Sequence, residues 1–172
     1  MAGKTRLQKC WIWNKTVTDF IRRKVHGYSL NVCAGKSAIG DVRVDVEPQA
    51  EGVIKADMRK LPFEDNTFDT VISDPPWKIG FYHRMKPFFE CVRVCKIKGR
   101  IIYNAYWIPT SKLVKLEELY VRQDTEWSNT SVISVFKKVP DVLDAKSVGR
   151  NPLKKHIIHN SKVYKLQSLN NC

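Results

Sequence analysis

The feature that most constrains this chain is an apolar run that ends in an acid and two prolines. Val71 and Ile72 follow the pattern of a short buried strand, and Asp74, Pro75 and Pro76 close the run. Because proline has no N–H to donate to a neighbouring strand, sheet pairing must stop there. We therefore expect a rigid loop at the carboxyl edge of a sheet, which is where open α/β sheets bind ligands.

The groups at this strand end suit a flat amino group. The Asp74 carboxylate and the Pro75 carbonyl accept hydrogen bonds, and Trp77 adds a planar apolar ring on which a flat group can stack. An exocyclic nitrogen of a nucleic-acid base is such a group. The structural alternative is a strand followed by a proline-rich turn with no chemical role.

Two stretches resemble a known family. Asp74-Pro75-Pro76-Trp77 resembles the D-P-P-[YW] motif of S-adenosylmethionine-dependent amino-methyltransferases, especially those that methylate adenine N6 in DNA or RNA. Residues 61–69, Leu-Pro-Phe-Glu-Asp-Asn-Thr-Phe-Asp, resemble the L-P-F-x-D-x-[ST]-F-D segment of many class I methyltransferases. The match runs in order from Asn31 to Trp77. It implies an α/β, Rossmann-like class I methyltransferase fold, with a mostly parallel sheet and an antiparallel terminal strand.

The resemblance also implies a cofactor, S-adenosyl-L-methionine, held at the ends of the first strands. These strands are expected at residues 29–34, 42–48, 53–58 and 70–73. Asp45, with Glu47 in reserve, would accept the ribose hydroxyls, Asp57 would bond the adenine amino group, and Met58 would pack against the adenine ring. The cofactor-binding residues expected in full are Asn31, Cys33, Ala34, Gly35, Asp45, Asp57, Met58 and Asp74.

The loop after the first strand departs from the family pattern. Asn31 stands where an acid is usual, and Cys33 and Ser37 replace common glycines. Residues 35–37, Gly-Lys-Ser, superficially resemble a phosphate-binding P-loop, but that motif needs a glycine where Leu30 stands, which excludes it. The departures support an alternative function, a non-catalytic module that resembles a methyltransferase and binds nucleic acid or activates a partner.

The spacing of the strands predicts shortened crossovers. Only about seven residues separate the first two strands, and a similar number separates the next two, whereas a helical crossover takes a dozen or more. The first two crossover helices should therefore be missing or reduced to single turns. The sheet face that they would cover must then be covered by the N-terminal segment, the C-terminal tail or a second subunit.

Further elements follow from hydrophobic periodicity. A helix capped by Thr16 or Thr18 should run to Val25, and a second helix, at 87–94, should turn Phe88 and Phe89 inward together with Val92 and Cys95. Strands are expected at 99–106, 119–127 and 131–137, with at most a short helix at 113–115. Trp11 and Trp13 either stack on a nucleic-acid strand or cover the core, and we favour the core. Cys91 and Cys95 are interpreted as buried thiols and His156 and His159 as surface residues, so no metal is expected.

Charge and length limit the partners and the compartment. The 172 residues carry a formal net charge of +13, which favours nucleic acid, DNA or RNA, over a membrane surface as the partner. No apolar run of about 18 residues and no signal peptide are present, and the five cysteines are scattered, so we expect a cytoplasmic protein with reduced thiols. The expected division is a basic aromatic segment with a lead-in helix (1–28), a methyltransferase domain (29–139) and a basic, partly docked tail (140–172).

The expected reaction is a direct in-line displacement in which an amino nitrogen attacks the sulfonium methyl group and S-adenosylhomocysteine leaves. Asp74, Pro75, Pro76 and Trp77 would be catalytic, through acceptors that stabilise the positive charge developing on nitrogen. The residues expected to bind the substrate are Trp77, Lys78, Phe81, Tyr82 and Arg84. Adenine N6 is favoured, cytosine N4 and guanine N2 remain open, and a protein glutamine is an alternative because a related N-P-P-Y motif serves that reaction. Because a target-recognition domain is absent, sequence selectivity is expected to be low or to come from a partner or from RNA shape, and a homodimer or a recognition subunit is a possible partner.

Overall fold

One mixed sheet organises the backbone in the computed structural model, which describes residues 13–76, 79–80, 83–122, 131–141 and 167–168. Its eight strands stand in the order β3-β2-β1-β4-β5-β7-β6-β8. The strands are β1 (Ser29–Val32), β2 (Val42–Asp45), β3 (Val53–Lys55), β4 (Phe68–Ser73), β5 (Cys95–Ala105), β6 (Val114–Arg122), β7 (Ser131–Lys138) and β8 (Gln167–Ser168). β1 to β5 pair in parallel, and β7 runs antiparallel to both β5 and β6. This confirms the predicted fold class.

β4 is the central strand, and its sequence explains why. It pairs with β1 on one side and β5 on the other, and its last paired residue is Ser73, opposite Val32 and Tyr103. Val71 and Ile72 are fully buried because both faces of a parallel sheet are covered. Pairing stops before Pro75 and Pro76, as the missing N–H groups require, so the motif lies at the carboxyl edge beside the end of β1.

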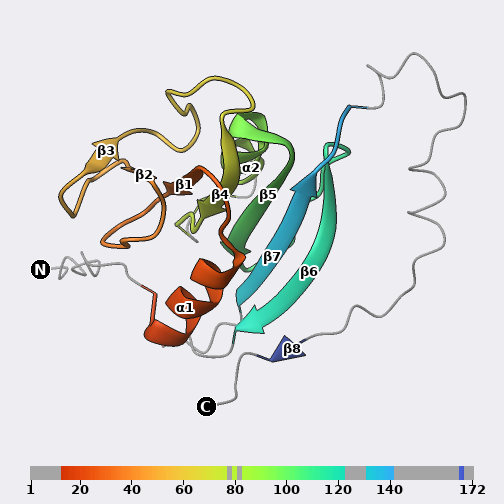
Figure 1. Ribbon diagram of the computed structural model, residues 1–172, viewed down its shortest axis with the longest axis horizontal. Coiled ribbons are helices and arrows are strands. Elements are labelled where there is room, and N and C mark those ends of the chain that lie inside the picture. Colours follow the sequence, from red (N-terminus) through yellow and green to blue (C-terminus); the bar gives the residue numbers. More distant parts are fainter. Residues whose placement is uncertain (1–12, 77–78, 81–82, 123–130, 142–166, 169–172) are drawn as a thin grey trace, which may run out of the picture.

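The helix α1 (Lys15–Lys24) covers one face of the sheet (Figure 1). Its buried side chains pack with Trp13 against isoleucines and valines of β4, β5 and β7. The N-terminal helix thus covers the sheet over β4, β5 and β7, and the expected cover of the face beside the first two crossovers stays a prediction. The predicted caps are wrong, because the Asn14 side chain, and not Thr16 or Thr18, accepts the N–H of Val17.

The helix α2 (Met85–Val94) lies on the opposite face (Figure 1) and completes the larger part of the core. Phe88, Val92 and Cys95 are buried as predicted. Phe89 is 48% exposed, which corrects its predicted inward position. Cys91, three residues after Phe88, takes the inward position on the same stripe of the helix.

The first two crossovers contain no helix, in agreement with the spacing. Residues 33–41 join β1 to β2 and residues 46–52 join β2 to β3, all in turns and irregular loops. Arg43 bridges them, because its guanidinium donates to the Ser37 carbonyl at 3.4 Å and to the Glu51 carbonyl at 3.0 Å. Ile39 folds into the core on the α1 side. Polar bonds and one apolar side chain therefore replace packed helices here.

Residues 113–115 do not form a helix. Val114 begins β6 and pairs with Lys138 of β7, so pairing across the sheet overrides the local pattern. None of the helices in the described ranges is long and apolar enough to span a membrane. The expected domain boundaries at residues 28 and 139 stay a prediction.

Candidate active site

Asp74 sits at the end of the central strand as a buried carboxylate held on two sides. Asp74 is only 5% exposed. The indole Nε1 of Trp13 donates to Oδ2 at 2.7 Å, and Nδ2 of Asn104 donates to Oδ1 at 2.9 Å. Both bonds are buried and short, in the range that charge-assisted bonds take. The carboxylate therefore has a fixed orientation.

These bonds change what the sequence suggested for two residues. Trp13 does cover the core, as favoured, but it also donates to the motif acid. The sequence analysis places Asn104 in a strand and gives it no role in the site. An ionised carboxylate has about four lone-pair sites, of which these two bonds occupy two. Nothing in the local sequence pairs residues 61 and 30 positions apart, so pattern reasoning missed both contacts.

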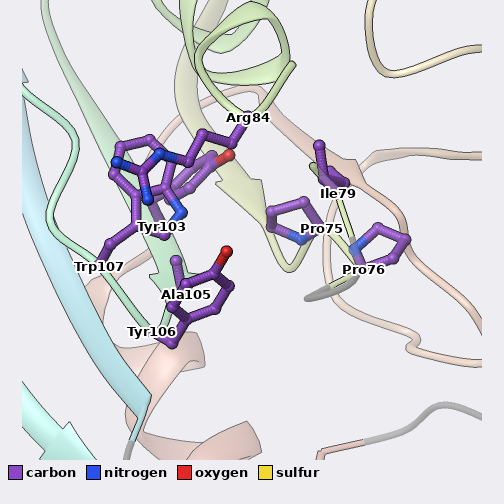
Figure 2. A pocket seen from close by; sticks show the side chains of 8 residues that line it. All are labelled: Pro75, Pro76, Ile79, Arg84, Tyr103, Ala105, Tyr106 and Trp107. Atoms are coloured by element: carbon purple, nitrogen blue, oxygen red, sulfur yellow. The ribbon is translucent and has the colours of Figure 1, made fainter. Parts of the chain in front are cut away.

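A small pocket opens beside the two prolines. It has a volume of about 10 Å³, on the scale of one water molecule. Its lining consists of Pro75, Pro76, Ile79, Arg84, Tyr103, Ala105, Tyr106 and Trp107. Figure 2 shows Arg84, Tyr103 and Trp107 gathered on one side, facing Pro75, Pro76 and Ile79 on the other.

The pocket combines a cation, aromatic faces and a buried hydroxyl. The Arg84 guanidinium lies over the Trp107 ring, 4.5 Å from its centroid. The Tyr103 hydroxyl is buried and has no hydrogen-bond partner within the described residues. Burial raises the pKa of Tyr103, so the hydroxyl stays neutral and can donate or accept. These are features of a site for a flat polar ring.

Of the predicted substrate-binding residues, Arg84 lines this pocket. Trp77, Lys78, Phe81 and Tyr82 lie outside the described residues. The sequence analysis missed Tyr103, Tyr106 and Trp107. Their signal was available, since a strand parallel to β4 that ends in aromatic residues delivers them to the same sheet edge.

The predicted cofactor residues after β1 come together at that edge. The N–H of Ala34 donates to the Val44 carbonyl at 3.0 Å, and the N–H of Gly35 donates to Asp45 Oδ2 at 2.9 Å. Cys33 has φ of 60°, in the left-handed region that favours glycine. The cysteine thus adopts the backbone conformation that the usual glycine would, and the loop keeps a tight turn.

The acids after β2 and β3 are placed at the same edge. Asp45 is partly exposed, and its Oδ1 accepts the N–H of Glu47 at 3.0 Å. Asp57 pairs with Arg59 at 2.7 Å, and hydrogen bonds from Arg59 lower the pKa of Asp57 to about 2. Met58 packs against the core, and its Sδ accepts from the Cys33 thiol at 3.3 Å.

This set of residues fits S-adenosylmethionine. Asp45 has acceptor capacity for hydroxyl groups, Met58 offers an apolar face, and ionised acids favour a cationic donor. Asn31 adds a buried Oδ1 at the end of β1 with no partner among the described residues. An unpaired buried acceptor is costly, and a donor group of a ligand would satisfy it.

The buried thiols do not take part. Cys91 and Cys95 are buried, as expected, and burial raises the pKa of each to about 12. Within the ranges that the structure describes, no three His, Cys, Asp or Glu side chains gather as a metal site would require. His156 and His159 lie outside those ranges.

The fold and the edge that it builds are those of a Rossmann-like, S-adenosylmethionine-dependent methyltransferase. A family model described as a methyltransferase domain matches residues 18–103, half of the 172-residue chain, and the chain belongs to that family. The protein is thus a methyltransferase, and this family implies S-adenosylmethionine as its methyl donor. No curated protein sequence matches it significantly.

Solved structures agree on the fold. The PH0226 protein from Pyrococcus horikoshii OT3 is similar with a TM-score of 0.55 at 19% identity, over 72% of this chain and 88% of that one. A TehB-like SAM-dependent methyltransferase from Corynebacterium glutamicum follows with a TM-score of 0.54 at 15% identity, over 72% and 87%. A methyltransferase from Haloferax volcanii, solved with the Trm112 activator, has a TM-score of 0.53 at 12% identity, over 73% and 89%. At these identities the likeness establishes the fold alone.

Proposed function

We propose that this protein methylates an exocyclic amino group of a nucleic-acid base, with adenine N6 as the favoured target. The observation that supports this most is the placement of Asp74-Pro75-Pro76 at the carboxyl edge, between the cofactor loop and the pocket lined by Arg84, Tyr103 and Trp107. Pro75, next to Asp74 in the chain, lines that pocket together with aromatic side chains and a cation, which suits a planar amine on an anionic chain. The net charge of +13 suits the same substrate class.

The cofactor would be held by the loop after β1 together with Asp45, Asp57 and Met58. Bound there, S-adenosylmethionine supplies an electrophilic methyl group on a sulfonium. Asp45 would bind hydroxyl groups, and Asp57, ionised at any physiological pH, would accept from the adenine amine. That second role requires Asp57 to share its oxygens with Arg59, to which it is now paired.

The substrate amine would be oriented by acceptors on a rigid backbone. The Pro75 carbonyl and the Asp74 carboxylate would accept its two N–H groups, and Asp74 would stabilise the positive charge that develops on nitrogen. Trp77 would stack on the ring, and Lys78, Phe81, Tyr82 and Arg84 would contact the chain around it. Because Asp74 is 5% exposed, its charge acts in a poorly hydrated setting, where electrostatic effects are strong.

Duplex substrate would require the base to leave the stack, and the pocket of about 10 Å³ must widen to receive it. Selectivity for a sequence would come from a homodimer or a recognition subunit. We propose the cytoplasm as the compartment, where Cys33, Cys91 and Cys95 would stay as the free thiols that the structure contains.

The test is to incubate the protein with methyl-labelled S-adenosylmethionine and DNA, RNA or protein, and to identify the modified nucleoside by mass spectrometry. We expect label in N6-methyladenine. Arg84→Ala should raise the KM for nucleic acid, whereas Lys98→Ala, at an exposed lysine in the amino-terminal part of β5, should not. Label in glutamine would establish the protein alternative, and cofactor binding without transfer would establish the non-catalytic module.

A further inference from the structure

We propose that Trp13 and Asn104 are positioning residues, which hold the Asp74 carboxylate in the orientation that methyl transfer needs. This inference rests on the proposed function. Neither side chain is assigned a contact with substrate or cofactor, and both act through Asp74. Both also lie just outside residues 18–103, the part matched by the family model, so the family resemblance alone does not point to them.

The geometry fixes the carboxylate from two independent elements. Trp13 precedes α1 and reaches Oδ2 at 2.7 Å, whereas Asn104 stands on β5 and reaches Oδ1 at 2.9 Å. One donor on each oxygen stops rotation of the carboxylate about its Cβ–Cγ bond. The carboxylate is thereby held in a constant orientation, and a preorganised acceptor stabilises a developing charge without reorganising.

Each donor is itself held. The Trp13 carbonyl accepts the Thr18 hydroxyl at 3.3 Å, and the Trp13 ring packs with α1 against the sheet. Asn104 is 2% exposed and its backbone pairs with Ile133 of β7. The indole and the amide are therefore rigid, which a supporting residue must be to place a reacting group within about half an ångström.

The chemistry of the donors argues for more than packing. Indole and amide N–H groups are neutral, so they orient Asp74 without neutralising its charge. Two titratable groups that interact electrostatically with Asp74 are Cys33 and Tyr103, whose pKa values are both raised, chiefly by burial, and which are neutral near pH 7. These two donors therefore leave the Asp74 carboxylate in its charged form.

The decisive variant is Trp13→Phe, which keeps an aromatic ring and removes the N–H. We expect kcat to fall at least about tenfold, the scale of one hydrogen bond to a charged group. The Kd for S-adenosylmethionine should stay within about twofold, because Trp13 is assigned no cofactor contact. The acid limb of the pH profile of kcat should move to higher pH, because the donor favours the ionised acid. Asn104→Leu should behave alike.

The control is Phe20→Leu, which weakens the packing of α1 in the same core cluster without a bond to Asp74. It should lower the melting temperature and leave kcat at 25 °C and its pH profile unchanged. If Phe20→Leu lowers kcat as much as Trp13→Phe, the effect is structural and the proposal is overturned. Wild-type kcat in Trp13→Phe overturns it as well.

A second readout does not need activity. In ¹⁵N-tryptophan-labelled protein, the indole signal lost in Trp13→Phe identifies the Trp13 N–H. We expect that signal to exchange slowly with solvent and to move in Asp74→Asn but not in Asp45→Asn. Rapid exchange refutes the pairing. If the pairing is present but wild type transfers no label, the proposed function fails, and the positioning role falls with it. Transfer retained in Trp13→Phe overturns the positioning role alone.

Discussion

Replacing Arg93 with methionine should lower the free energy of unfolding by about 3 kcal/mol. Arg93 stands in the last turn of α2 and holds the loop that precedes β4. Its guanidinium donates to both oxygens of Glu90 at 2.8 Å, to Asp65 at 2.8 Å, and to the carbonyls of Leu61 and Phe63 at 3.0 and 2.7 Å. Methionine keeps most of the stem and removes all five donated bonds.

The magnitude follows from burial and from what is left unpaired. The Arg93 side chain is 30% exposed and the Glu90 side chain 18%. Each bond to a charged group contributes about 1.5–3 kcal/mol, but bonds of one side chain are not additive, and water can reach the exposed part. Glu90 also keeps one partner, the N–H of Leu61. About 3 kcal/mol, the lower end for breaking a buried pair, is the resulting expectation.

The matched control is Arg59→Met. Arg59 also pairs with a carboxylate, but its side chain is 55% exposed and that of Asp57 is 41% exposed. Exposed pairs contribute about 0–1 kcal/mol, so this variant should change the free energy of unfolding little. In thermal melts, Arg93→Met should lower the melting temperature by about 6–12 °C for a chain of this size, and Arg59→Met by less than about 4 °C.

Acid provides the test of mechanism. Hydrogen bonds from Arg93 hold the pKa of Glu90 below its ordinary value of 4.5 in the folded protein. The stability that this pairing contributes is present above the unfolded-state pKa and is lost as pH falls through the folded-state value. The difference between wild type and Arg93→Met should therefore shrink in urea unfolding as the pH falls below about 4.5. A difference under about 1 kcal/mol at pH 7, or one that persists unchanged in acid, would refute the reasoning.

Three further changes test separate parts of the structure. Cys33→Gly should raise the melting temperature by a few degrees, about 1 kcal/mol, because φ of 60° strains the cysteine; an unchanged or lower value contradicts the strain. Lys138→Met should cost about 2 kcal/mol in urea unfolding, since Lys138, 8% exposed, donates to the Asn66 side chain and to two backbone carbonyls; a loss below 0.5 kcal/mol contradicts this. Asp57→Ala should raise the Kd for S-adenosylmethionine about tenfold by calorimetry, with no change in the pH 5–8 trend because the pKa of Asp57 is about 2; equal affinity removes it from the site.

The sequence was sufficient for the sheet but not for the contacts that complete the site. Strand spacing predicted the bare crossovers, and the two prolines predicted where β4 stops, because both depend on local chain geometry. The prediction that Phe89 of α2 faces the core was wrong. Two adjacent apolar residues in a sequence do not reveal which of them faces the sheet. The prediction of a short helix at residues 113–115 was wrong, because pairing with β7 makes this stretch the start of a strand.

The unpredicted contacts share a physical reason. The bond of Trp13 to Asp74 spans 61 positions and that of Asn104 spans 30, and each depends on where α1 and β5 dock in three dimensions. The conformation of Cys33 was missed in the same way, because a residue type that disfavours positive φ is held there by surrounding structure. Sequence patterns indicate the helices and strands, whereas the side-chain contacts between them depend on how those elements pack.

The order of the strands in the sheet bears on the order in which the molecule folds. β5, β6 and β7 are consecutive in the chain and lie together, so they close on short loops, whereas β1 must find β4 about forty positions away, opposite pairs such as Leu30 and Val71. Strands β5, β6 and β7 should therefore assemble early, and the half of the sheet that contains β1, β2 and β3 should assemble late. Because the loop after β1 belongs to the late part and Asn104 to the early one, we expect catalytic competence to appear in the final phase of refolding. Stopped-flow recovery of methyl transfer ahead of β1 protection in hydrogen exchange would reverse that order.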